Sequence, residues 1–180
     1  MIVPPPRIPP LRYIPLPAAH ARCPGVYWHA SSAFLDELAA YLKGKRVLEV
    51  FAGNGYLAAR LIEFGVSIRP TSKLTGHDAH ERGLYTQVEE LDAESAVKLY
   101  GRESDVLLMS WPTVTPAAFR AAQLWGRGRP ICYIGEMTDY AAGRLGGCAT
   151  DEFFAAIDVV YSFKSYRGRD GDFAVICQLR

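Results

Sequence analysis

The residues best placed to do chemistry lie in one stretch, KRVLEVFAGNGYLAARLIEFG, at positions 45–65. Glu49 lies near the end of an apolar run, and Gly53 and Gly55 follow it before a segment whose apolar residues have helical spacing. Glycines here permit a tight turn and let a ligand approach the backbone, while the following helix offers free N–H donors. A carboxylate beside that turn accepts a hydrogen bond from a cationic amino group but repels a pyrophosphate. The stretch therefore predicts a site for a nucleoside ligand that carries positive charge.

The same turn admits two further interpretations. Residues 53–58, GNGYLA, also fit the GxGxxA pattern of dinucleotide-binding proteins, which predicts a nicotinamide oxidoreductase. A tight strand-to-helix turn that binds nothing would need the same two glycines. Glu49 distinguishes a cationic nucleoside such as S-adenosylmethionine from NAD. Its carboxylate attracts the cationic amino acid end of S-adenosylmethionine and repels the pyrophosphate of NAD. The residues favour S-adenosylmethionine.

The elements that position this turn alternate between strand and helix. Strands are predicted at 46–51, 66–72, 87–91, 105–111 and 130–136, and helices at 31–42, 56–64, 94–100 and 116–125. Such alternation predicts a parallel sheet with helices on both faces. A further helix capped by Thr150 precedes two more strands, 158–163 and 173–179, which flank SYRGRDGD and predict an antiparallel hairpin. The polar segment 73–86 has no periodicity and is expected to be a functional loop.

On these residues the chain resembles the class I S-adenosylmethionine-dependent methyltransferases, a Rossmann-like family, over about residues 31–180. The stretch EVFAGNG is most similar to the FAGxG variant found among amino-group methyltransferases of nucleic acids. The resemblance implies an α/β three-layer sandwich with a mainly parallel seven-stranded sheet in the order 3-2-1-4-5-7-6 and a terminal antiparallel hairpin. It also implies S-adenosylmethionine as cofactor, held by Glu49, Phe51, Gly53, Asn54, Gly55 and Asp92.

The end of the predicted fourth strand, DVLLMSWPTV, supplies the candidate substrate site. In amino-group methyltransferases this position carries an Asp, Asn or Ser followed by two prolines and an aromatic residue. Ser110, Trp111 and Pro112 hold the same chemical types in a different order, so the resemblance implies that Ser110 and Trp111 are the catalytic residues. The methyl acceptor implied is an amino group of a nucleobase or small molecule. Packing of Trp111 at the strand end is the alternative.

One landmark of the family is missing. The acidic residue that holds the ribose hydroxyls should follow the second strand, near RPTSK, where Ser72 stands and Asp78 lies farther on. Asp92 has a second interpretation, because it is also well placed to cap the helix that follows it. These departures support an alternative function, a catalytically inactive methyltransferase-like protein that binds a nucleoside or another partner.

Other polar residues carry weaker signals. Glu136 ends the fifth strand and is a candidate for substrate binding, or a solvated charge. His77, Asp78 and His80 have no distant third ligand, so no metal site is predicted. Cys148 has no evident histidine partner and is expected to be an ordinary cysteine.

Composition narrows the class of protein further. The chain has 180 residues, 49% of them hydrophobic, which suits one domain with a single core. Its formal net charge of +1 gives no support for nucleic acid as a partner. The four cysteines form no CxxC pair, and no apolar run approaches about 20 residues, so we expect a cytoplasmic protein without a membrane segment.

The start of the chain differs from the rest. Eight of the twelve prolines lie before Gly25, so residues 1–26 cannot form a helix or an internal strand. We expect a Pro-rich arm that packs on the body of the protein or on a partner, for example a second subunit in a homodimer. A PxxP ligand for another protein is the alternative. Residues 27–180 are expected to form the single methyltransferase-type domain.

Overall fold

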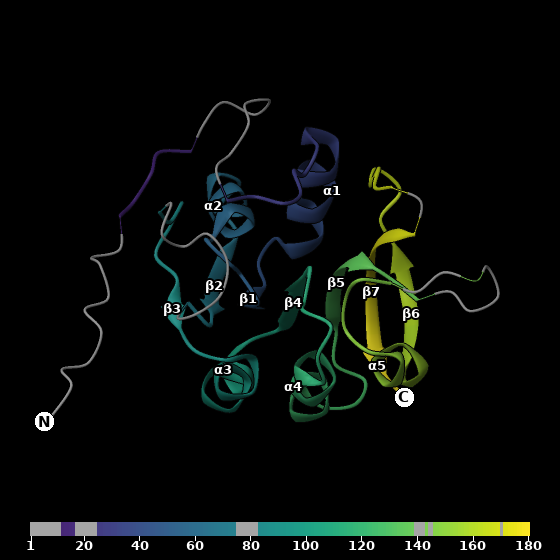
Figure 1. Ribbon diagram of the computed structural model, residues 1–180. Helices are drawn as coiled ribbons and strands as arrows, with labels where there is room; N and C mark the ends of the chain where they lie inside the picture. The colour runs from purple at the N-terminus through teal and green to yellow at the C-terminus, as the bar shows by residue number, and fades with distance from the viewer. Residues whose placement is uncertain (1–11, 17–24, 75–82, 139–142, 144–145, 170) are drawn as a thin grey trace, which may run out of the picture.

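The computed structural model describes residues 12–16, 25–74, 83–138, 143, 146–169 and 171–180. Within them, one seven-stranded sheet has the order β3-β2-β1-β4-β5-β7-β6 (Figure 1). The pairs from β3 to β5 are parallel, and β7 runs antiparallel to both β5 and β6. The predicted strand order and terminal hairpin are therefore confirmed. The strands are β1 (Arg46–Val50), β2 (Ser67–Ser72), β3 (Glu89–Glu90), β4 (Val106–Ser110), β5 (Ile131–Glu136), β6 (Ile157–Ser162) and β7 (Asp172–Leu179).

Helices cover both faces of the sheet and complete the predicted three layers. They are α1 (Ser32–Leu42), α2 (Tyr56–Glu63), α3 (Ala93–Tyr100), α4 (Ala117–Trp125) and α5 (Asp151–Ala156). Figure 1 shows α1 and α2 on one face and α3, α4 and α5 on the other. Alternate residues of β1 face the two sides: Val47 packs in the core beneath α1 and α2, and Leu48 in the core beneath α3 and α4. None of the helices described here is long and apolar enough to cross a membrane.

Strand β3 is shorter than the predicted strand 87–91. The residues before it leave the sheet edge and pack on the start of α2, where a Cβ added to Gly55 would lie 2.7 Å from Val88 Cγ2 and 2.9 Å from Thr86 Cγ2. Only Thr71 and Ser72 of β2 therefore pair with β3. Among the described residues, no strand pairs with the amino-terminal half of β2 on this side, which we call the free edge.

Pro70 lies on this edge without breaking the sheet. The Ala52 N–H donates to Thr71 O, and the Leu91 N–H donates to Ser72 O. The backbone groups of neighbouring β2 residues therefore point to opposite sides of the strand. Pro70 has the orientation of Ser72, and its missing N–H therefore points to the free edge, where β1 does not need it.

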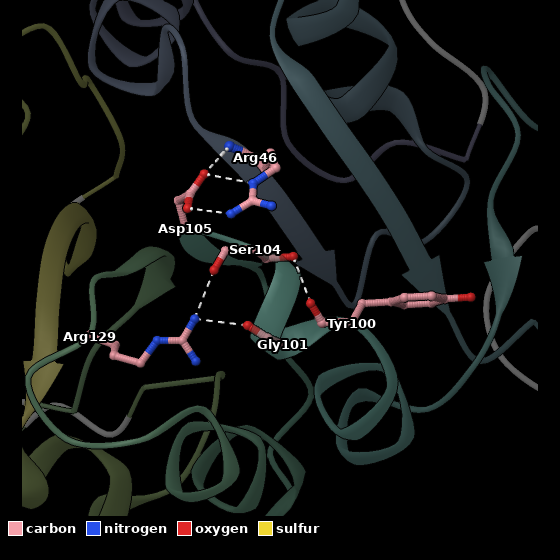
Figure 2. A network of polar contacts seen from close by, with 6 residues as sticks. All are labelled: Arg46, Tyr100, Gly101, Ser104, Asp105 and Arg129. Atoms are coloured by element: carbon pink, nitrogen blue, oxygen red, sulfur yellow. Dashed lines mark hydrogen bonds and ion pairs between the residues drawn. The ribbon is translucent and has the colours of Figure 1, made fainter.

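A polar network fixes the amino ends of β1 and β4 (Figure 2). The Asp105 carboxylate accepts from the Arg46 backbone N–H at 2.8 Å and from its guanidinium at 3.0 and 3.2 Å. Arg129 donates to the carbonyls of Gly101 and Ser104, both at 2.8 Å, and its guanidinium lies 3.5 Å from the ring centroid of Trp125. This network lies at the end of the sheet opposite the glycine turn, so it stabilises the scaffold rather than the candidate site.

Candidate functional site

The two glycines of the turn after β1 have different surroundings. Both have a left-handed backbone, with φ of 57° at Gly53 and 76° at Gly55. A Cβ at Gly53 would meet nothing within 4 Å, whereas Gly55 is contacted by the side chains that shorten β3. The described part of the chain thus leaves space for a ligand at Gly53 and fills the space at Gly55.

Glu49 is a buried acid without a partner for one oxygen. Its residue is 1% exposed, and Oε2 has no hydrogen-bond partner among the described residues. It faces the side of the sheet covered by α1 and α2, in the same orientation as Val47. Burial raises the pKa of Glu49 to about 8, because the protein interior disfavours the charged form. A cation placed beside Oε2 would reverse that preference.

A cavity of about 120 Å³ lies between this acid and the turn. It brings together six of the eight residues predicted for the site, which come from the ends of β1 and β4: Glu49, Phe51, Gly53, Asn54, Ser110 and Trp111. Ligands of open parallel sheets bind at the carboxyl ends of the strands, which is where this cavity lies. The glycine turn and the predicted substrate residues therefore share one cavity.

Phe51 and Trp111 occupy matching positions at this cavity. Each directly follows its strand, β1 or β4, and each has a left-handed backbone, with φ of 64° and 51°. Such a conformation costs a non-glycine residue about 1–3 kcal/mol and is concentrated at functional sites. The Trp111 N–H donates to Ile134 O at 2.7 Å, while its buried Nε1 has no partner among the described residues. Two residues that line the cavity, Glu49 and Trp111, thus each carry a buried polar atom without a described partner.

The other two predicted residues do not line the cavity. Gly55 packs against its own chain, and Asp92 caps α3, its Oδ1 accepting from the Ser95 N–H at 2.8 Å. The hydrogen bond from Ser95 lowers the pKa of Asp92. The capping interpretation of Asp92 matches this geometry.

Ser72 occupies the position where the resemblance implies a ribose-binding acid. Ser72 is buried, and its hydroxyl accepts from the Gly53 N–H at 3.2 Å, so it serves the turn itself. His77, Asp78 and His80 lie outside the described residues. Within the described ranges, no group of three or more His, Cys, Asp or Glu could hold a metal ion.

Glu136 and Cys148 join two loops at the end of β5. The Glu136 carboxylate accepts from the Gly147 N–H, and the Tyr133 hydroxyl donates to Glu136 O. Cys148 is buried, and burial raises the pKa of its thiol. Ala149 then donates to Pro112 O at 3.4 Å. This contact links the β5 end to the segment after Trp111, although Glu136 and Cys148 do not line the cavity.

The segment Gly25–Trp28, for which the sequence carries no functional signal, also lines the cavity. The Asn54 side-chain amide donates to Gly25 O at 3.2 Å. Asn54 O accepts from the Tyr85 N–H at 2.9 Å, and the neighbouring Leu84 pairs with Tyr13 of the arm. These contacts join residues far apart in the sequence, and no local spacing indicates them.

A larger cavity, of about 500 Å³, lies along the free edge of β2 near the amino ends of β1 and β2. Two of its charged side chains, Arg69 and Glu89, are already paired with each other. Arg69 lies 3.7 Å from Glu89 and stacks on the Tyr100 ring, and the Tyr100 hydroxyl donates to Glu89 at 2.7 Å. Volume alone therefore does not make this groove the chemical site, and the smaller cavity holds the unpartnered acid.

Comparison with solved structures identifies the architecture. The crystal structure of MtNAS in complex with MTA and tNA superposes with a TM-score of 0.53 at 15% identity over 82% of this chain. The glycopeptide N-methyltransferase MtfA complexed with sinefungin superposes with 0.52 at 12% identity, over 89% of this chain and 99% of its own. The mitomycin 7-O-methyltransferase MmcR gives 0.50 at 16% identity over 82% of this chain.

The chain has the class I methyltransferase fold. It spans 60% of the length of MtNAS and 53% of that of MmcR. No family model and no curated protein matches its sequence. At these identities the methyltransferase likeness concerns the fold.

Proposed function

We propose that this methyltransferase fold binds S-adenosylmethionine and transfers its methyl group. The observation that carries the proposal is Glu49, a carboxylate 1% exposed and unpartnered at Oε2, beside a glycine turn that leaves Gly53 open. Among proteins of similar fold, an E81Q mutant of MtNAS is solved in complex with S-adenosylmethionine, and MtfA with sinefungin. Both ligands support a nucleoside cofactor here.

The residues present fit the amino acid end of this cofactor. Glu49 Oε2 has no hydrogen-bond partner among the described residues. A cationic amino group would donate to it, and a sulfonium would supply a counter-charge. The adenosine end needs more room, because pockets for ligands of this size measure about 300–1,000 Å³. The cavity has about 120 Å³ while Gly25–Trp28 lines it. The whole cofactor is larger than the cavity as it stands, so we propose that Gly25–Trp28 adjusts its position when the cofactor binds.

Bound S-adenosylmethionine supplies a methyl group activated by the sulfonium charge. The chain's own task is to orient the acceptor for in-line attack and to exclude water. We assign the Ser110 hydroxyl and its backbone carbonyl to accept hydrogen bonds from an acceptor amine, and the Trp111 indole to contact the acceptor. The acceptor proposed is an amino group of a nucleobase or small molecule.

Titration calorimetry tests the cofactor. Full-length protein is titrated with S-adenosylmethionine and with its demethylated product, S-adenosylhomocysteine, and the same titrations are run on Glu49→Gln. Loss of a charge-assisted contact, worth about 1.5–3 kcal/mol, should weaken S-adenosylmethionine binding by about 10- to 150-fold. Glu152→Gln, an exposed acid in α5, is the control and should bind like the wild type.

A second candidate is a binding protein without transferase activity. Two observations favour it: Ser72 is occupied by the turn, and the cavity is small. Nucleoside binding without methyl transfer to any amine offered would support this candidate. Heat from NAD alone would instead support the nicotinamide oxidoreductase, although a buried acid beside the turn disfavours a pyrophosphate.

A further inference from the structure

Five aromatic residues line the small cavity around Glu49. They come from the segment before α1, the turn after β1, the start of α2 and the end of β4: Tyr27, Trp28, Phe51, Tyr56 and Trp111. Aromatic rings carry a negative face that attracts cations within about 6 Å, and several rings around one cation form the sites that recognise quaternary ammonium groups. The composition of this wall therefore favours a cationic ligand.

The cavity has a carboxylate but no basic side chain among its described lining residues. Glu49 is 1% exposed, and its Oε2 has no described partner. Other titratable groups near it are the phenols of Tyr27 and Tyr56, which line the cavity, and the Cys132 thiol, in the same row of the sheet on β5. None of these groups supplies a positive charge. The Arg60 guanidinium lies 5.4 Å from the Tyr56 ring centroid but is paired with Glu63. A cationic ligand would therefore be the charge partner that holds Glu49 in its ionised form.

Size and hydrogen bonding select the kind of cation. A cavity of about 120 Å³ is close to the roughly 150 Å³ cavity that holds a benzene molecule. A primary ammonium would bring three donors, each of which needs an acceptor when buried. Among the described lining residues, the side-chain acceptors are the Glu49 carboxylate, the Asn54 amide oxygen and the hydroxyls of Ser110, Tyr27 and Tyr56, and only Glu49 can carry a negative charge. A quaternary ammonium has no N–H donor and needs no such acceptors.

We propose that this cavity, with Gly25–Trp28 in place, binds a small quaternary ammonium group through Glu49 and the surrounding aromatic rings. The site goes beyond the proposed cofactor site, because it does not need the adenosine part of a ligand. A choline-like head group fits the chemistry. Such a ligand and S-adenosylmethionine compete, since both place positive charge beside Glu49.

Binding at this site is coupled to a proton. Burial raises the pKa of Glu49 to about 8, so the acid is mostly neutral at pH 7. A bound cation favours the carboxylate, and binding therefore releases a proton. Between pH 6 and 8 the affinity should rise by up to about tenfold per pH unit and then level off.

The test is calorimetric titration of the full chain with tetramethylammonium chloride, with tert-butanol as a neutral ligand of similar shape. Tetramethylammonium should bind and tert-butanol should bind at least tenfold more weakly. Glu49→Gln should weaken tetramethylammonium at least tenfold, and the control Glu152→Gln should not change it. Equal binding of the two ligands, or binding unaffected by Glu49→Gln, overturns the proposal.

A second variant tests the aromatic wall without disturbing the core. Tyr27 is 77% exposed, so Tyr27→Ala should fold, and loss of one cation–π contact should weaken tetramethylammonium about 2- to 30-fold. Unchanged affinity in this variant contradicts the role of the aromatic wall. S-adenosylmethionine is titrated separately: binding of tetramethylammonium alone rejects the proposed function and keeps this site, and binding of S-adenosylmethionine alone does the reverse.

Discussion

The side chain of Asn54 donates to the backbone carbonyl of Gly25 at 3.2 Å, which ties the glycine turn to a segment 29 positions earlier in the sequence. Asn54 O also accepts from the Tyr85 N–H at 2.9 Å. One residue thus connects the cavity with the chain before α1 and with the chain before β3. A change in the structure of the cavity should therefore alter the local stability of both segments.

Removing the hydrogen bond between Asn54 and Gly25 should increase local opening of the segment Gly25–Trp28, which lines the cavity. In Asn54→Ala the side-chain hydrogen bond is lost, at a net cost of about 1 kcal/mol, which corresponds to about a fivefold rise in local opening. Hydrogen–deuterium exchange measured by mass spectrometry should show faster exchange at residues 25–28 and unchanged exchange in α1. Equal exchange of residues 25–28 in variant and wild type would show that the tie does not hold them.

The buried acid should make stability depend on pH. Because the folded pKa of Glu49 is about 8 and its ordinary value is 4.5, folding favours the protonated acid. Its contribution to the free energy of unfolding is fully present below pH 4.5 and is lost as pH rises to about 8, on the order of 5 kcal/mol in all.

Urea unfolding of wild type and Glu49→Gln between pH 4.5 and 9 measures this contribution. Since glutamine does not titrate, the variant should gain stability relative to the wild type as pH rises. A constant difference between the two proteins across this range would mean that Glu49 is not held neutral.

The two glycines of the turn should respond differently to alanine. Gly53→Ala adds a Cβ into open space and should cost only the strain of a left-handed backbone, about 1–2 kcal/mol. Gly55→Ala adds contacts of 2.7 and 2.9 Å to Val88 and Thr86, so it should cost about 1–3 kcal/mol more.

Thermal unfolding of the two variants provides a matched comparison, and ligand titration separates their roles. Gly53→Ala should impair binding in the cavity more than its stability loss suggests. If Gly53→Ala proved the less stable of the pair, the space beside Gly53 would not be open in solution.

The polar network at the other end of the sheet should depend on the planar shape of arginine. Arg129 donates to the backbone carbonyls of Gly101, Ser104 and Trp125 while its guanidinium stacks on the Trp125 ring, an arrangement that a lysine cannot reproduce. Arg129→Lys should lower the free energy of unfolding by about 2 kcal/mol in urea titration. Arg127→Lys, at an exposed neighbour, serves as the control. If Arg129→Lys and the control lowered the free energy of unfolding by the same amount, the planar guanidinium of Arg129 would not be what stabilises this network.

Local sequence patterns predicted most of the fold. The apolar run ending at Val50, the glycines after it and the apolar spacing of α2 together specify a strand, a turn and a helix. The Gly- and Asp-rich segment before Phe173 indicated the hairpin of β6 and β7. These features depend on residues close together in sequence, which is why they could be predicted.

Other features of the site depend on distant residues. The length of β3 follows from packing of Val88 on Gly55, and the role of Ser72 follows from the Gly53 N–H, neither of which has a sequence signal. The burial of Glu49 depends on α1, α2 and the segment at Gly25, whose contacts only tertiary structure establishes. The pattern of residue types therefore indicated Glu49 as a site residue. It did not indicate the raised pKa of Glu49 or the segments that bury it.

Pro70 has a consequence for the behaviour of this protein in concentrated solution. An exposed strand margin can recruit strands from other molecules and so begin growth into fibrils. Pro70 has no backbone N–H to donate to a strand from another molecule. The hydrogen bonds between such a strand and β2 would therefore be interrupted after one or two residues. The side of β2 that no described strand covers thus resists acting as a template for self-assembly.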